Sequence, residues 1–118
     1  SGLSTVDRAS AGQLVDILRY VYGTANRDLF FNSLATPGKL SLKGRMESDE
    51  FKSLRENLRV KTGFVSGSHG LAGAFKNAAG NEYIFAIIVN DYDPDRTVGA
   101  RDFVDQSILY LQSSPVLP

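Results

Sequence analysis

The sequence predicts an α+β domain in which a small antiparallel sheet of three strands is flanked by helices. Apolar residues recur at helical spacing near both ends of the chain, and three short runs typical of strands follow one another between residues 58 and 89. A turn-forming segment at 77–81 connects the last two runs, which makes that pair antiparallel. Since 118 residues is an ordinary length for one domain, we expect residues 1–118 to form a single domain.

The first helix is predicted over residues 11–22. Ser10 and Gln13 have the spacing of a capping box, in which each side chain accepts a hydrogen bond from the other residue's backbone N–H. Four apolar residues then fall on one helical stripe: Leu14, Ile17, Leu18 and Val21. Gly23 ends the pattern.

Two further helices are predicted, one short and one at the end of the chain. The short helix spans 26–34 and stops before the turn-forming Pro37-Gly38 pair, while the last helix covers about 99–113. Charged residues crowd the stretch 39–57 and its apolar positions are scattered. We therefore expect that stretch to be a solvated connection with one helical turn.

Three strands are predicted at 58–62, 71–76 and 83–89. Gly and Asn in the segment 77–81 accept the positive φ angles that a hairpin loop requires. The third strand is apolar at both odd and even positions, so both of its faces must be covered by the helices. We expect it to be the central strand of the sheet.

Composition excludes several classes of function. The chain has 13 basic and 13 acidic residues and a net charge of zero, which argues against a nucleic-acid partner. Its longest apolar run, residues 83–89, is far shorter than the roughly twenty residues of a membrane-spanning helix. With no cysteine and one histidine, the sequence excludes disulfides, thiolate catalysis and multi-histidine metal centres, so we predict no metal and no cofactor.

The candidate site is Lys61-Thr62-Gly63 at the end of the first predicted strand. The lysine ammonium and the threonine hydroxyl can both bind a substrate carboxylate, and the glycine lets a ligand lie close to the strand. If the strand edge is open, the backbone amide of Phe64 can donate to a developing oxyanion. As a tripeptide this signal is weak, and a strand end with an exposed lysine and a glycine turn is the better explanation of the tripeptide alone.

The residues around Lys61-Thr62-Gly63 strengthen the functional interpretation of this tripeptide. Several blocks, in order, resemble the C-terminal part of the serine-type D-alanyl-D-alanine carboxypeptidases, which are low-molecular-mass penicillin-binding proteins. The clearest blocks are 58–67, 71–74 and 85–90, and fainter ones are Ser1-Gly2-Leu3-Ser4, Ser33-Leu34-Ala35 with Pro37-Gly38, and Leu42-Lys43-Gly44-Arg45-Met46.

This resemblance implies the C-terminal part of a β-lactamase/penicillin-binding-protein-like transpeptidase fold, located outside the cytoplasmic membrane. It implies that Lys61 and Thr62 bind the carboxylate of a D-Ala-D-Ala peptide of peptidoglycan or of a β-lactam. Gly63 would be the permissive strand position, and the backbone N–H of Phe64 the oxyanion donor. A smaller or hydroxylated residue is common in the family at the position of Phe64, so its bulk can narrow the entrance.

The family's nucleophile is missing from this sequence. No serine is followed by a lysine at the third position, and no Ser-x-Asn occurs. We expect the chain alone to be inactive and to be the C-terminal portion of a longer enzyme, with the N-terminal portion as its partner. The alternative is a standalone, non-catalytic binding module that holds a peptide or a partner at the strand edge 61–65.

Three other features are interpreted as structural. Asp91, Asp93, Asp95 and Asp102 imitate the spacing of a calcium loop, but the loop lacks the required glycine, so we expect a solvated loop. His69 is predicted to lie in a surface turn. The aromatic residues next to the first helix are expected to pack in the core or to contact the remainder of the protein: Tyr20, Tyr22, Phe30 and Phe31.

Overall fold

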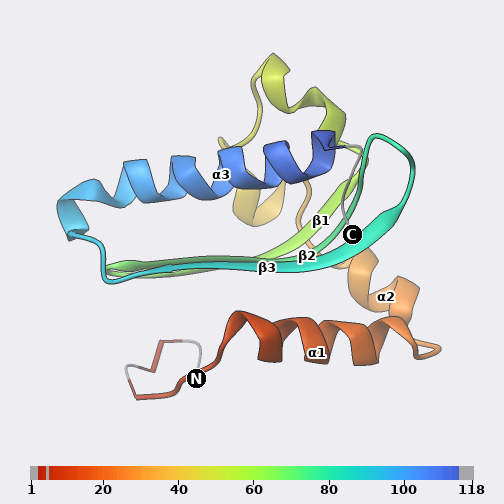
Figure 1. Cartoon of the computed structure of the whole chain (residues 1–118), viewed down its shortest axis with the longest axis horizontal. Helices are drawn as coiled ribbons and strands as arrows, with labels where there is room; N and C mark the ends of the chain where they lie inside the picture. Colours follow the sequence, from red (N-terminus) through yellow and green to blue (C-terminus); the bar gives the residue numbers. More distant parts are fainter. Residues whose placement is uncertain (1–2, 5, 115–118) are drawn as a thin grey trace.

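The computed structural model describes residues 3–4 and 6–114, and it has three layers. The elements are, in order, α1 (Ala11–Tyr22), α2 (Arg27–Asn32), η1 (Leu40–Leu42), η2 (Asp49–Leu54), β1 (Leu58–Val65), β2 (Ser68–Lys76), β3 (Glu82–Asn90), η3 (Pro94–Arg96) and α3 (Thr97–Ser113). Figure 1 shows α1 on one face of the sheet and α3 on the other. The predicted α+β class, with three antiparallel strands between helices, is confirmed.

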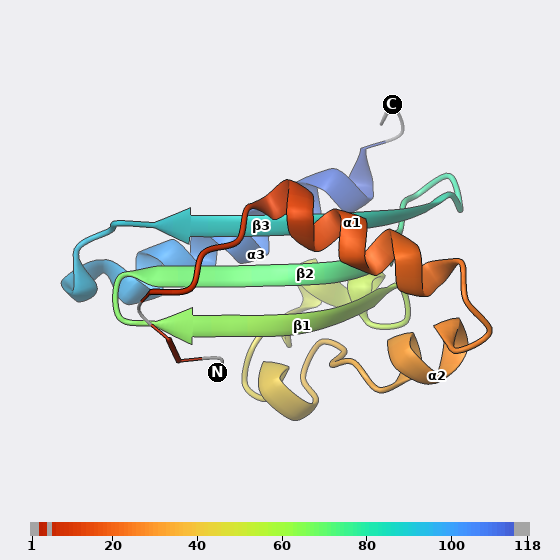
Figure 2. The ribbon, with the colours of Figure 1, turned by 90° about the horizontal axis from the view of Figure 1, so that it is seen from below.

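The strand order is β1-β2-β3, and both neighbouring pairs are antiparallel (Figure 2). The prediction that the third strand is central is therefore wrong, because β2 lies between the other two. The double-sided apolar pattern of β3 reflects cover by α1 and α3, with which it makes contacts on its two faces. Cover of the faces does not determine whether a strand has neighbours on both edges.

The first two strands are longer than predicted and form a hairpin of their own. A two-residue turn, Ser66-Gly67, separates them, and Gly67 adopts the positive φ of 79° that the turn needs. The second hairpin turn lies at 77–81 as predicted. There Asn77 Oδ1 accepts from the backbone N–H groups of Ala79 and Asn81.

Two apolar clusters hold the layers together. The larger one lies between the sheet and α3 and contains, among others, Leu58, Val60, Leu71, Phe75, Phe85, Val104 and Ile108. The smaller one lies between the sheet and α1 and contains Leu18, Phe31, Leu34 and Ala74. The aromatic residues near α1 differ in exposure, because Phe31 is buried whereas Tyr20 is 76% exposed.

The segment 39–57 is not the solvated connection that its charge suggested. It contains two 3-10 helices, η1 and η2, and the side chains of Leu42 and Leu54 are fully buried in the larger cluster. The prediction was wrong because a few well-spaced leucines in a charged stretch are enough to anchor it to the core.

The three helices agree with their predicted positions within a few residues. The capping box of α1 is present: Ser10 N–H donates to Gln13 Oε1 (2.8 Å), and Gln13 N–H donates to Ser10 Oγ (3.1 Å). The predicted apolar stripe is only partly buried, because Leu18 is covered while Ile17 is 60% exposed. No helix in the described part of the chain is both long and apolar enough to cross a membrane.

Candidate functional site at the outer edge of strand β1

Strand β1 presents its predicted site residues on alternate faces of the sheet. Val60 packs in the cluster under α3, so Thr62 and Phe64 also lie on that face. Lys61 pairs with Ala72, which packs against the α1 cluster, so Lys61 and Gly63 lie on the opposite face. The two carboxylate-binding side chains of the sequence prediction therefore leave the strand in opposite directions.

The backbone groups of β1, unlike these side chains, meet at one edge of the sheet. Val60 and Ala35 exchange both of their hydrogen bonds, at 2.9 Å each, on the side of β1 that faces away from β2. In an antiparallel ladder the backbone groups of successive residues alternate in direction. The N–H and C=O groups of Thr62 and Phe64 therefore point to this same outer edge, along which no further strand pairs within the described residues.

The Lys61 ammonium also reaches the outer edge. Lys61 is exposed, and its Nζ donates to the carbonyl oxygen of Thr62 at 2.7 Å. Because that carbonyl points outward, the bond places the positive charge beside the outward N–H of Phe64. An anion at this edge would meet a cation and backbone donors together, and charge-assisted hydrogen bonds of this kind are the strong ones.

The surroundings of Gly63 are open, and the Phe64 side chain is more than half exposed. A Cβ atom added to Gly63 would meet no heavy atom within 4 Å, so the strand is accessible there. The Phe64 side chain is 55% exposed. Thr62 is half-buried, on the same face as Phe64.

Beside Phe64 lies a residue whose position was wrongly predicted. His69 is in strand β2, not in a surface turn, and is 6% exposed. It lies opposite Phe64 in the ladder, with ring centroids 4.6 Å apart, and it also stacks with Tyr92, whose ring centroid is 5.9 Å from its own. The Ser66-Gly67 dipeptide, which favours a turn, was the signal that β2 begins before His69.

The surroundings of His69 lower its pKa. Burial is the first cause, because it disfavours the charged imidazolium, and the positive charges of Arg45 and Arg101 add to it. The carboxylate of Asp105 acts in the opposite direction. His69 Nε2 is buried and has no hydrogen-bond partner among the described residues.

A buried ion pair lies between α3 and the loop before η2. Arg45 Nε donates to both carboxylate oxygens of Asp105, at 2.9 and 3.0 Å, and its Nη2 donates to Oδ1 at 2.6 Å. The two side chains are 12% and 8% exposed. The sequence showed no sign of this pair, because its members are sixty positions apart.

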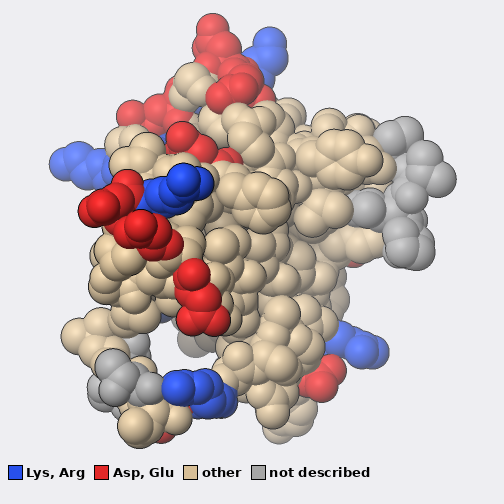
Figure 3. Space-filling view, turned by 60° about the vertical axis from the view of Figure 1, so that its left-hand side comes forward, with Lys and Arg blue, Asp and Glu red and all other residues tan. Residues whose placement is uncertain are grey.

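The residues considered for a calcium loop are arranged as a helix start. Asp93 Oδ1 accepts from the N–H of Asp95 at 3.0 Å and caps η3. Within residues 3–4 and 6–114, no group of three or more potential metal ligands comes together. Figure 3 shows acidic and basic side chains interspersed on one face of the molecule.

Comparison with solved structures identifies the class of fold. Penicillin-binding protein 4 (dacB) from Haemophilus influenzae, crystallised with a novel β-lactam, superposes with a TM-score of 0.81 at 22% identity. The match covers 97% of this chain and 27% of that chain. A second structure of the same Haemophilus protein superposes with a TM-score of 0.78 at 22% identity, and the match covers 97% of this chain and 26% of that chain. The sheet and helices described above thus have the fold of part of a penicillin-binding protein.

Sequence comparison then places the chain in a family. Residues 1–108 match the pattern of the D-Ala-D-Ala carboxypeptidase 3 (S13) family, and the chain belongs to that family. No curated protein sequence matches it. The resemblance noted from the sequence is confirmed, and the chain spans about a quarter of the length of the solved relatives.

Proposed function

We propose that this chain supplies the substrate-binding strand of a serine-type D-Ala-D-Ala carboxypeptidase or endopeptidase that acts outside the cytoplasmic membrane on peptidoglycan stem peptides. The observation that carries the proposal is the outer edge of β1, where the Lys61 ammonium binds the outward carbonyl of Thr62 and the N–H of Phe64 points in the same direction. Membership of the S13 family and the penicillin-binding-protein fold support it.

Each site residue has a role in this proposal. Lys61 and Thr62 approach the terminal carboxylate of the peptide, or that of a β-lactam, from the two faces of β1 and hold it at the outer edge, and Gly63 leaves room for the ligand backbone. The Phe64 N–H donates to the oxyanion of the tetrahedral intermediate that precedes the acyl-enzyme. The serine that attacks the D-Ala-D-Ala bond, and the lysine that activates it, come from residues outside this sequence, so the chain by itself is inactive.

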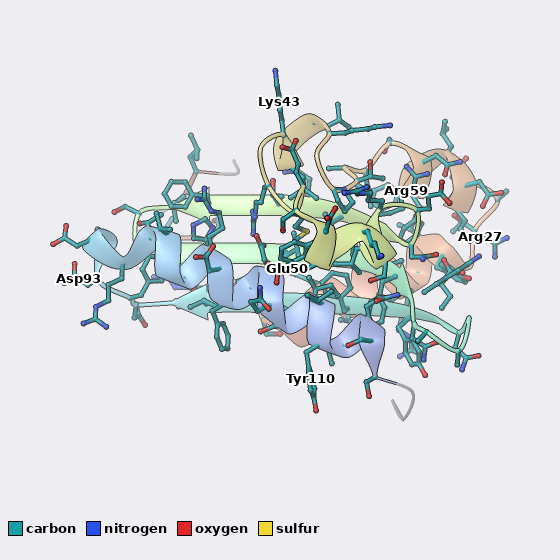
Figure 4. All side chains as sticks on the ribbon, turned by 90° about the horizontal axis from the view of Figure 1, so that it is seen from above. Arg27, Lys43, Glu50, Arg59, Asp93 and Tyr110 are labelled. Carbon is teal, nitrogen blue, oxygen red and sulfur yellow. The ribbon has the colours of Figure 1, made fainter. Side chains whose placement is uncertain are left out.

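An apolar surface lies at the β3 edge of the sheet, the edge opposite the candidate site, and it supports the proposal that another part of the same protein binds there. Ile87 on β3 and Phe103, Tyr110 and Leu111 on α3 line a hollow of about 460 Å³. Phe103 is 62% and Tyr110 74% exposed, and Figure 4 shows Tyr110 projecting outward from α3. In this proposal the remainder of the enzyme, the N-terminal portion of the domain to which residues 1–118 belong, covers these side chains.

Labelling with a fluorescent penicillin tests the function. We expect the full-length protein that contains this chain to give a covalent band, and the isolated chain to give none. In the full-length protein, Lys61→Ala should slow labelling at least about tenfold, because one charge-assisted hydrogen bond, worth roughly 1.5–3 kcal/mol, is lost. Lys52→Ala, which removes an exposed lysine from η2, is the matched control and should label at the unaltered rate.

The second candidate is a non-catalytic module that binds an extended peptide by strand addition. The outward backbone groups of Thr62 and Phe64, along which no further strand pairs within the described residues, favour it. Two results together would support the module and overturn the enzyme function. No protein of any mass takes the label, and the isolated chain binds a D-Ala-D-Ala peptide with an affinity that Lys61→Ala lowers. Equal labelling of the Lys61→Ala and unaltered proteins would remove Lys61 from the site.

A further inference from the structure

Three aromatic rings form a row, here called the stack, at the end of the sheet that carries the candidate site; Phe64 is tilted by 30° against His69. Phe64 of β1, His69 of β2 and Tyr92, which follows β3, lie in sequence, with centroid distances of 4.6 and 5.9 Å. The His69 and Tyr92 rings are nearly parallel, at 13°. The stack thus joins the strand that holds the Phe64 amide to the loop beyond the far strand.

The backbone around Tyr92 is shaped to hold this stack. Asp91 adopts a φ of 59°, a left-handed conformation that few residues other than glycine accept, and this turns the chain after β3. A Cβ atom on Gly67 would lie 3.4 Å from the carbonyl oxygen of Tyr92, so the β1–β2 turn packs against the same loop. Ser68 and Asn90 add a side-chain hydrogen bond of 2.6 Å between β2 and β3.

The middle ring of the stack is the ionisable one. His69 is buried, and Arg45, Arg101 and Asp105 are the charged groups that act on it, with the Tyr92 ring on one side and the Phe64 ring on the other. His69 Nε2 and Tyr92 Oη are both buried and without a hydrogen-bond partner among the described residues. A proton added to this imidazole would therefore introduce an unpaired buried charge, which is unfavourable.

We propose that His69 is a positioning residue: its neutral ring, held between Tyr92 and Phe64, fixes the end of β1 so that the Phe64 amide stays aimed at the outer edge, and protonation releases it. That this positioning affects the binding of a ligand by the Phe64 amide rests on the proposed function. The direction of the effect follows from the lowered pKa, since the folded chain binds a proton on His69 less readily than the unfolded chain does. Stability contributed by the neutral ring is complete above the unfolded pKa of about 6.5 and decreases as the pH falls below it, levelling off once the pH is below the folded pKa.

NMR of the isolated chain tests the coupling directly. His69 is the one histidine in the sequence, so its imidazole signals are unambiguous in an untagged protein. We expect these signals to titrate below pH 6.5, and the amide signal of Phe64 to shift and exchange faster with the same midpoint. His69→Phe, which keeps a flat ring, should abolish the pH response of the Phe64 amide. Titration of His69 at or above 6.5, or a Phe64 amide that does not follow it, would overturn the proposal.

Penicillin labelling of the full-length protein provides the functional readout. Between pH 7.5 and 5.0 the labelling rate of the unaltered protein should fall about fivefold or more relative to His69→Phe, the lower end of a typical coupling between two sites. Parallel pH profiles would overturn the positioning role while leaving the enzyme function intact. If the unaltered protein takes no label at any pH, the proposed function fails, and the NMR titration alone decides the coupling.

A second variant keeps the test valid if His69→Phe does not fold. Tyr92→Leu leaves His69 and Phe64 in place but removes one side of the stack. It should move the pKa of His69 upward, toward its ordinary value, and speed exchange of the Phe64 amide at pH 7.5. An unchanged His69 titration and unchanged exchange in this variant would contradict the proposal.

Discussion

Replacing Asp105 by asparagine is expected to lower the free energy of unfolding by about 3 kcal/mol. The Arg45 guanidinium, whose side chain is 12% exposed, would lose the carboxylate that accepts three hydrogen bonds from it. A buried charge without its partner is far more costly than the absence of the whole pair. Urea unfolding of the unaltered and altered chains, followed by circular dichroism, measures the difference.

Two comparisons test this explanation. Asp28 forms an exposed ion pair with Arg27, in which the Asp28 side chain is 84% exposed. Asp28→Asn should therefore change stability by less than about 0.5 kcal/mol. The double variant Arg45→Met with Asp105→Leu should regain most of the lost stability, because it removes both charges. A loss of less than about 1 kcal/mol for Asp105→Asn would contradict the importance of burial in this pair.

The second large effect is expected at Gly73, in the middle of β2. A Cβ atom there would overlap the carbonyl oxygen of Arg59 and lie 2.8 Å from Cα of Val60. Both atoms belong to the backbone of β1, so a side chain at position 73 must displace the strand itself. We expect Gly73→Ala to lower the free energy of unfolding by about 3 kcal/mol, at the upper end of ordinary overpacking.

Gly70 is the matched control for Gly73, because it lies in the same strand. An added Cβ atom at Gly70 would meet the carbonyl oxygen of Ile87 at 3.8 Å, an ordinary contact. Gly70→Ala should therefore change stability by less than about 1 kcal/mol. Denaturant unfolding compares the two variants, and equal effects at positions 70 and 73 would show that the close approach of β1 and β2 at Gly73 is unimportant.

Local patterns in the sequence predicted the elements that local chemistry determines. The Ser10–Gln13 capping box, the helical repeat of α3 and the turn at 77–81 each depend on residues close together in the chain. The same patterns could not give the strand order. An apolar side chain such as that of Ile84 must be buried, but the sequence does not say whether a helix or a strand buries it.

The sequence singled out the residues that are proposed for the site, but it could not predict how they are arranged. Lys61-Thr62-Gly63 was predicted to end a strand, but it lies inside β1, which continues to Val65. The outward direction of the Phe64 amide follows from the bridge between Ala35 and Val60, which are distant in sequence. The stack on His69 likewise depends on the register of β1 against β2 and on the turn at Asp91. Pairings between remote segments leave no periodic trace, which is why Arg45 and Asp105 were also missed.

The bridge between Ala35 and Val60 also sets a limit on what can lie along β1. Ala35 occupies the outward backbone groups of Val60, while those of Thr62 and Phe64 extend beyond it along the same edge. A long polypeptide passing along the whole strand would collide with the Ala35 backbone. If β1 holds a peptide as proposed, the tip of that peptide would stop short of the obstruction, so the edge would admit a chain terminus in preference to the interior of a chain.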